Sequence, residues 1–359
     1  MDTISQQIGE IEKEIRETPH HKGTERHLGI LRARIAKLKD RQIEGVSKKT
    51  GGGGGYAVKK QGDATVVLVG PPSAGKSTLI NQLTNAESKV APYAFTTVSV
   101  IPGMLKYNDA YIQILDVPGL IEGARRGKGR GREVLSVVRN SDLLVLITDP
   151  KRISAFEIMQ KELEASGIRI NKLPPQIKID KKIAGGIIVH TNIRQEISEE
   201  EIADIAREFG IKNAEITIRE KVTTDRLIDS FATSRVYVPA ILVVNKSDML
   251  GKNVISRLSK NYVLISAENG SGVAPLKEKL WEFLGFYRIY LVKPNEKPSM
   301  INPTVVKSNM TLLQVAQDIG TEFASSKTEA EIWGPGAKFP GQTVSLSAMI
   351  KDGMMVRFV

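Results

Sequence analysis

Residues 64–78, ATVVLVGPPSAGKST, decide the fold class of this chain. The first six are an apolar, β-rich run typical of a buried strand, and a helix-like sequence begins at Ser77. Between them, GPPSAGKS matches G-x-x-x-x-G-K-[ST] in the strand–loop–helix context that this phosphate-binding motif requires. The glycines let backbone N–H groups close around phosphate oxygens, and the helix N-terminus adds positive potential. The stretch predicts a P-loop nucleotide-binding domain and leaves ATP and GTP both open.

Further apolar, β-rich runs occur at residues 111–115, Leu143–Thr148, Ala240–Val244 and 262–265. Strands separated by helical stretches indicate an α/β fold with a doubly wound, mostly parallel sheet. Asn245 follows Asp116 by 129 positions, whereas two βαβ steps of about 30 residues each need only about 60. The surplus predicts an inserted small α/β domain. Its clearest element is a helix that is capped at Ser198 and closed at Gly210.

The predicted organisation has five parts. They are a basic helical hairpin (1–50), a Gly-rich linker (51–62), a nucleotide-binding domain in two segments (63–150 and 239–287), the insert (151–238) and a compact β-rich module (288–359). The hairpin is predicted from two apolar stripes at helical spacing with a break between them. It is either a packing or dimerisation element or a basic arm that touches RNA.

Composition excludes several classes of protein. There is no cysteine, so disulfides and thiolate metal sites are absent. The apolar runs are strand-sized, and the N-terminus lacks the order of a signal peptide, so we expect a cytoplasmic protein without a membrane span. The net charge of +11 favours a polyanionic partner, although a generally soluble basic surface explains it equally well.

Three motifs predict the phosphate and metal chemistry. Lys76 is placed to reach the β- and γ-phosphates, and the Ser77 hydroxyl to ligate Mg²⁺. Asp116-Val117-Pro118-Gly119 ends a strand, where the carboxylate can hold Mg²⁺ through water. In the loop Phe95-Thr96-Thr97, a threonine can complete the Mg²⁺ shell only when the γ-phosphate is present.

Asn245-Lys246-Ser247-Asp248 identifies the base. An aspartate at this position accepts two hydrogen bonds from the N1–H and N2–H₂ edge of guanine, and adenine offers no matching pair. Ser266-Ala267-Glu268, after another strand, supplies a backbone N–H towards the guanine oxygen. Five motifs in this order at successive strand ends predict GTP as the ligand.

Leu120 stands where simpler GTPases carry the glutamine that orients the attacking water. Hydrolysis must then use another polar group, a partner's group or a second cation, or be slow. Residues 125–132, RRGKGRGR, follow with five basic side chains in eight positions. They are either a solvated flexible loop or a mobile switch that meets phosphate.

The chain resembles the developmentally regulated GTP-binding (DRG) proteins, a branch of the Obg-type GTPases. The resemblance covers essentially the whole chain, through HLGILRARIAKLK, GPPSAGKSTLIN, YAFTTVSVIPG, ILDVPGLIEGA, NKLPPQIKI and RVYVPAILVVNKSD. It implies an N-terminal helical hairpin, a P-loop GTPase domain interrupted by a small α/β insert, and a C-terminal TGS module of β-grasp fold. It also implies Mg²⁺-dependent GTP hydrolysis and association with ribosomes or RNA.

Carried over by motif, the resemblance gives the following nucleotide-binding residues: Gly70, Pro71, Pro72, Ser73, Ala74, Gly75, Lys76, Ser77, Thr78, Phe95, Thr96, Thr97, Val98, Ser99, Asp116, Val117, Pro118, Gly119, Asn245, Lys246, Ser247, Asp248, Ser266, Ala267 and Glu268. Ser77 and Thr97 are the implied Mg²⁺ ligands, with Asp116 acting through water. The catalytic group that replaces glutamine is unknown, and Lys76 and Thr97 support the phosphate chemistry. Potassium activation stays open because the P-loop asparagine often associated with it is Ser73 here.

The main functional hypothesis is a slow GTPase switch whose GTP and GDP states differ in affinity for the translation machinery. One alternative is a ribosome- or RNA-binding scaffold in which GTP is mainly a structural ligand. Another is a regulator of a non-ribosomal partner, such as a small protein bound through the TGS module. A monomer is expected.

Overall fold

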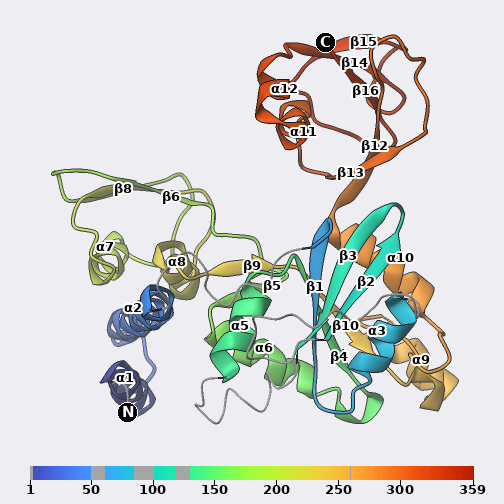
Figure 1. Ribbon diagram of the computed structural model, residues 1–359. Coiled ribbons are helices and arrows are strands. Elements are labelled where there is room, and N and C mark those ends of the chain that lie inside the picture. Colours follow the sequence, from blue (N-terminus) through green and yellow to red (C-terminus); the bar gives the residue numbers. More distant parts are fainter. Residues whose placement is uncertain (1–2, 50–60, 85–100, 118–129, 259) are drawn as a thin grey trace. The chain divides into compact units, whose positions relative to one another are not determined.

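The computed structural model describes residues 3–49, 61–84, 101–117, 130–258 and 260–359, which belong to two compact units (Figure 1). We call Met1–Ala57 with Leu163–Tyr237 the hairpin unit, and Val58–Glu162 with Val238–Val359 the sheet unit. Within the described residues, no helix is both long and apolar enough to cross a bilayer.

A six-stranded sheet forms the centre of the sheet unit. Its order is β11 (Val263–Leu264), β10 (Ala240–Val244), β4 (Leu143–Thr148), β1 (Ala64–Val69), β3 (Ala110–Asp116) and β2 (Ile101–Tyr107). Only the β2–β3 pair is antiparallel among these neighbours. The predicted mostly parallel sheet is confirmed, although the strand predicted at 262–265 is only the two residues of β11.

The sheet is buried on both faces, which explains its continuous apolar runs. Val66 and Leu68 of β1 pack in one core cluster with α3 (Lys76–Thr84) and α10 (Val273–Leu284). Val67 and Val69 alternate with them, are equally buried and lie outside that cluster. Helices α5 (Arg130–Arg139) and α6 (Ala155–Ala165) lie on the side opposite α3 (Figure 1). The sheet unit also contains η2 (Pro150–Arg152), η3 (Ser247–Met249) and α9 (Lys252–Leu258).

The C-terminal part is a five-stranded β-grasp module. Its order is β13 (Pro303–Lys307), β12 (Phe286–Leu291), β16 (Met355–Phe358), β14 (Glu329–Trp333) and β15 (Gln342–Ser345). The first and last strands, β12 and β16, are parallel neighbours, and the other pairs are antiparallel. Helix α11 (Leu312–Ile319) packs into the module's core, begins at a capping box on Thr311, and is followed by α12 (Thr321–Ser325).

The hairpin unit begins with two antiparallel helices, α1 (Thr3–Glu17) and α2 (Glu25–Lys49). The Gln42 side chain donates to the Ser5 hydroxyl at 3.0 Å, while His27 near the turn lies 3.1 Å from Glu14. The insert contributes a sheet of β6 (Ile177–Lys181), β8 (Ala214–Ile218) and β7 (Ile187–Thr191), with helices α7 (Glu199–Glu208) and α8 (Thr224–Phe231). The short strand β5 (Ile168–Ile170) pairs with β9 (Val236–Val238).

Helix α2 packs directly on the insert. Ala33 and Ala36 are buried in the same core cluster as the insert's helices and strands. Arg26 bonds to Asp204 at 2.5 and 2.8 Å, and Arg34 bonds to Glu208 at 3.0 Å. These contacts support the packing alternative for the hairpin, because arginines that could have met RNA are paired with carboxylates of the insert.

Candidate nucleotide site

The predicted motifs gather at one edge of the central sheet. Strands β3, β1, β4, β10 and β11 are parallel neighbours in that order, so their carboxyl ends meet at the same edge. In open α/β sheets this edge is where ligands bind. Gly70, Asp116, Asn245 and Ser266 all lie at or just beyond the ends of these strands.

The P-loop has the backbone geometry that close approach to phosphate needs. Ser73 and Gly75 have φ angles of 60° and 88°. A Cβ at Gly75 would lie 2.2 Å from the Asn245 amide nitrogen, and one at Gly70 would lie 2.2 Å from the Ile147 carbonyl oxygen. Only glycine fits at these two positions because backbone or buried amide atoms occupy the space.

Lys76 begins helix α3, and its ammonium lies over the loop that precedes it. Nζ donates to the carbonyl oxygens of Gly70 at 3.1 Å and Pro71 at 3.2 Å. The free N–H groups of the helix's first turn and this ammonium place positive charge at the same loop. That arrangement suits the polyphosphate of a nucleotide.

Ser77 and Asp116 lie together and form a candidate magnesium site. The Ser77 hydroxyl donates to Oδ2 of Asp116 at 3.0 Å. The other carboxylate oxygen, Oδ1, is buried and has no hydrogen-bond partner among the described residues. A hydroxyl and a carboxylate are the hard oxygen donors that Mg²⁺ prefers. The two residues therefore fit the metal that the motif implies.

Asn245 joins three loops of the site. Its amide nitrogen donates to the Ala74 carbonyl oxygen of the P-loop at 2.9 Å, and its side-chain oxygen accepts from the Ala267 backbone N–H at 2.9 Å. The side chain is 2% exposed. Asn245 thus fixes the phosphate loop against both segments predicted to contact guanine.

Lys246 and Asp248 extend from this joint towards the base position. Lys246 has a φ of 60°, and its Nζ donates to the Ser73 carbonyl oxygen at 3.0 Å. Asp248 lies in the short helix η3 and is exposed, with no ion pair or hydrogen bond to another described side chain. Its carboxylate is therefore available to a ligand beside the lysine stem.

Asp149 and Arg152 form an ion pair at the same edge of the sheet, and sequence reasoning missed it. Asp149 follows β4, between the P-loop strand and the guanine-motif strand, and accepts from Lys151 N–H at 3.0 Å and from Arg152 Nε at 2.9 Å. Burial alone raises the pKa of Asp149, but the hydrogen bonds and charge of Arg152, with Lys246 nearby, hold that pKa below its usual value. An aspartate directly after a buried strand was the available signal.

Several predicted residues lie outside the described part of the chain. They are Phe95, Thr96, Thr97, Val98, Ser99, Pro118, Gly119 and Leu120, together with residues 51–55 and 125–129 of the glycine-rich segments. The described residues bring together the P-loop, Asp116 and Val117, the 245–248 motif and the 266–268 motif.

Replacing Asn245 is expected to destabilise the folded protein. We expect Asn245→Ala to lower the free energy of unfolding by about 2–4 kcal/mol, because it leaves a buried carbonyl and a buried N–H unpaired. Urea denaturation followed by circular dichroism measures this. Asn261→Ala, the same change at an exposed position, should stay within about 0.5 kcal/mol of the parent protein. Equal effects of the two changes would contradict the role given to Asn245.

Comparison with known proteins agrees with this geometry. A family model described as "50S ribosome-binding GTPase" matches residues 65–181, and one described as "C-terminal region of MMR_HSR1 domain" matches residues 184–286. An uncharacterized GTP-binding protein of Methanocaldococcus jannaschii is 43% identical over 99% of this chain and 93% of its own length. Developmentally-regulated G-protein 1 of Arabidopsis thaliana is 38% identical, covering 99% and 91%. Developmentally-regulated GTP-binding protein 2 of Homo sapiens is 37% identical, covering 99% of both.

Proposed function

Because the chain belongs to the developmentally regulated GTP-binding (DRG) protein family, we propose that it acts as a slow, nucleotide-dependent switch on ribosomes or RNA. As a member of this family it is a GTP-binding protein with a GTPase domain. The proposal adds Mg²⁺-dependent hydrolysis of GTP to GDP and phosphate, and a partner whose affinity depends on which nucleotide is bound.

The observation that carries the proposal is the joint at Asn245. A single buried side chain bonds both to the P-loop and to Ala267, so the phosphate-contacting and base-contacting segments are held as one structure. Such a joint suits a nucleotide that is gripped at both ends. The position of Asn245 also supports guanine as the base. Asp248, the residue predicted to read guanine, is exposed and follows Asn245 by only three positions.

The residues have separate tasks in the proposed reaction. Lys76 and the N–H groups of the P-loop hold the β- and γ-phosphates and stabilise the negative charge that develops during transfer. Ser77 and Asp116 would hold Mg²⁺, which supplies further neutralisation of phosphate charge when bound. The side chain of Leu120 can neither accept nor donate a proton. The attacking water therefore has to be oriented by another group, which supports a slow intrinsic rate.

The proposed partner follows from charge and from the family description. The sequence has a surplus of 11 positive charges, and the matching family model carries ribosome binding in its description. Neutralising phosphates releases counterions, so binding of this kind weakens as salt rises.

Sedimentation with purified ribosomes tests the switch. The full chain is centrifuged with ribosomes in GDP and in a non-hydrolysable GTP analogue, each at two salt concentrations. We expect more protein in the pellet with the analogue and less with either nucleotide at the higher salt. Pelleting that is equal in the two nucleotides would favour the scaffold alternative, in which GTP is mainly structural. No pelleting under any condition would favour a non-ribosomal partner, for which the C-terminal module is the candidate docking site through its proposed TGS identity.

A further inference from the structure

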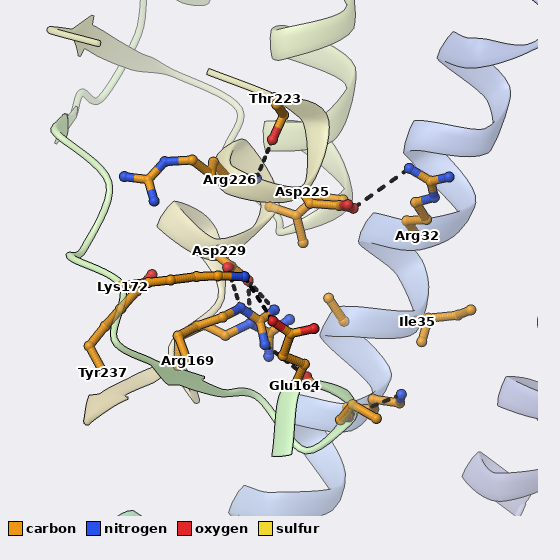
Figure 2. A pocket seen from close by; sticks show the side chains of 15 residues that line it. Arg32, Ile35, Glu164, Arg169, Lys172, Thr223, Asp225, Arg226, Asp229 and Tyr237 are labelled. Atoms are coloured by element: carbon orange, nitrogen blue, oxygen red, sulfur yellow. Dashed lines mark hydrogen bonds and ion pairs between the residues drawn. The ribbon is translucent and has the colours of Figure 1, made fainter. Parts of the chain in front are cut away.

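The hairpin unit contains a cavity far from the nucleotide motifs in sequence. It has a volume of about 630 Å³ and lies among α2, α8, β5 and β9, and every residue that lines it belongs to this unit (Figure 2). A volume of this order is typical of small-molecule sites. Ile35, Ala36 and Ile228 give it an apolar wall beside its charged groups.

The lining of this cavity is strongly basic. It contains three acidic residues, Glu164, Asp225 and Asp229. The basic residues number six: Arg32, Lys39, Arg169, Lys172, Arg226 and Arg235. Most of these cations have a carboxylate partner. For example, Lys172 lies 2.8 Å from Glu164, and Arg32 lies 3.7 Å from Asp225. A positive charge that no carboxylate neutralises marks a place where a bound anion would be stabilised.

Two arginines share a single carboxylate at the centre of the cavity. Arg169 bonds to Asp229 through Nε at 2.6 Å and Nη2 at 2.7 Å, and Arg235 bonds to the same Asp229 through Nε at 2.6 Å. All three side chains are largely buried. Asp40 lies 3.9 Å from Arg235. The shared carboxylate fixes both guanidinium planes, and a guanidinium has more N–H donors than these bonds use.

Lys39 adds a cation without a carboxylate of its own among the described residues. Its Nζ donates only to the Ala165 carbonyl oxygen, at 3.3 Å. Burial lowers the pKa of Lys39, Glu12 opposes this shift, and the charges of Arg235 and Arg169 add to the lowering. An anion in the cavity would relieve this repulsion between neighbouring cations.

Tyr237 provides a second unsatisfied group. Its hydroxyl oxygen is buried and has no hydrogen-bond partner among the described residues. Burial and the charge of Asp229 raise the pKa of this hydroxyl, against the opposing charges of Arg169, Arg226 and Arg235. The hydroxyl therefore stays protonated near neutral pH, as a donor on a residue that lines the cationic cavity (Figure 2). Buried polar groups are nearly always hydrogen-bonded, so a ligand oxygen is the acceptor that this site lacks.

We propose that the cavity binds a small phosphorylated molecule, at a site separate from the GTP site. The arginine guanidiniums, the Lys39 ammonium and the Tyr237 hydroxyl offer donors of different geometry to one tetrahedral oxyanion, and guanidinium is well matched to phosphate. The volume exceeds that of phosphate alone, and the wall of Ile35, Ala36 and Ile228 receives an apolar or aromatic body. This site does not depend on the proposed switch function.

Binding of simple phosphates to the GDP-saturated full-length protein tests the site. Excess GDP and Mg²⁺ occupy the P-loop, so isothermal titration with inorganic phosphate and phenyl phosphate reports on other sites. We expect one saturable site per chain that prefers phenyl phosphate, because its ring reaches the apolar wall. Lys39→Met and Tyr237→Phe should each weaken phenyl phosphate binding by about tenfold. Lys212→Met, which removes an exposed charge elsewhere in the unit, should leave it unchanged.

The two cavity variants are chosen so that a folding defect cannot imitate the result. Neither Lys39 nor Tyr237 has a carboxylate partner that the change would leave unpaired in the described structure. Both variants should keep the parent melting temperature in the absence of phosphate, and both should bind GDP normally. Binding that Lys212→Met weakens as much as Lys39→Met would overturn the proposal, as would the absence of saturable binding. A short RNA that displaces phenyl phosphate and binds more tightly would also overturn it, because the cavity would then contact a nucleic-acid backbone.

Discussion

Asp248→Asn is expected to change the preferred base from guanine to xanthine. The aspartate carboxylate accepts from N1–H and N2–H₂ of guanine, whereas an asparagine amide would face N2–H₂ with N–H groups of its own. Xanthine carries an oxygen in place of that amino group, and the amide can donate to it. Each hydrogen bond to a charged group contributes about 1.5–3 kcal/mol, so GTP affinity should fall by about 10²–10⁴-fold.

Competition binding with GTP and xanthosine triphosphate measures this change of preference. Asp248 is exposed in η3 and no described side chain bonds to its carboxylate, so the change breaks no bond that holds the fold. Glu282→Gln serves as the matched control, because it removes one negative charge from an exposed position on α10. The control should bind GTP like the parent protein. A variant at Asp248 that keeps its preference for GTP would show that the base is recognised elsewhere.

The sheet and the nucleotide edge could be predicted because their signals are local. A buried strand needs a continuous apolar run, and the P-loop needs glycines at fixed offsets from Lys76, so both are visible in short windows of sequence. Once the strands are taken as parallel, their carboxyl ends must share an edge. The meeting of Ser77 with Asp116, 39 positions apart, follows from that rule and is found at 3.0 Å.

Other features depend on contacts that no local pattern reveals. Asn245 was identified from its motif as part of a base-reading segment, but its bonds to Ala74 and Ala267 require the folded positions of three separate loops. The same holds for Arg26, whose partner Asp204 is 178 positions away. The basic surplus of the hairpin indicated either RNA or packing, and the sequence could not show that carboxylates of the insert lie opposite those arginines.

The cavity of the hairpin unit illustrates this limit most clearly. Arg169, Asp229 and Arg235 look like ordinary surface charges in the sequence, where Arg169 is on β5, Asp229 is on α8 and Arg235 directly precedes β9. Folding buries them together and fixes two cations on one carboxylate. Counting charges along the chain cannot separate paired from unpaired groups in space.

Lys76→Ala is expected to remove most GTP hydrolysis. The ammonium at the P-loop is positioned by the carbonyl oxygens of Gly70 and Pro71, at the start of α3. Loss of one preorganised donor to a developing negative charge lowers the rate constant by about 10²–10³-fold. Phosphate release is measured under single-turnover conditions, with the protein in excess of GTP and at a concentration well above the dissociation constant. Such conditions separate a slower chemical step from weaker binding. Lys279→Ala, at an exposed position on α10, should hydrolyse GTP at the parent rate.

Ser77→Ala distinguishes the role of the candidate magnesium site from that of Lys76 in the P-loop. It removes the hydroxyl that bonds to Asp116, so we expect hydrolysis to fall with a shift to much higher Mg²⁺ requirement, while Lys76→Ala should fail at every Mg²⁺ concentration. Ser77→Thr keeps a hydroxyl at the same position and should restore the parent Mg²⁺ dependence. Melting curves of the three variants check that each is folded. Unchanged hydrolysis in both alanine variants would place the reaction outside the P-loop. An unchanged Mg²⁺ requirement in Ser77→Ala would show that Ser77 is not a metal ligand, because deleting a ligand oxygen weakens the binding of the ion.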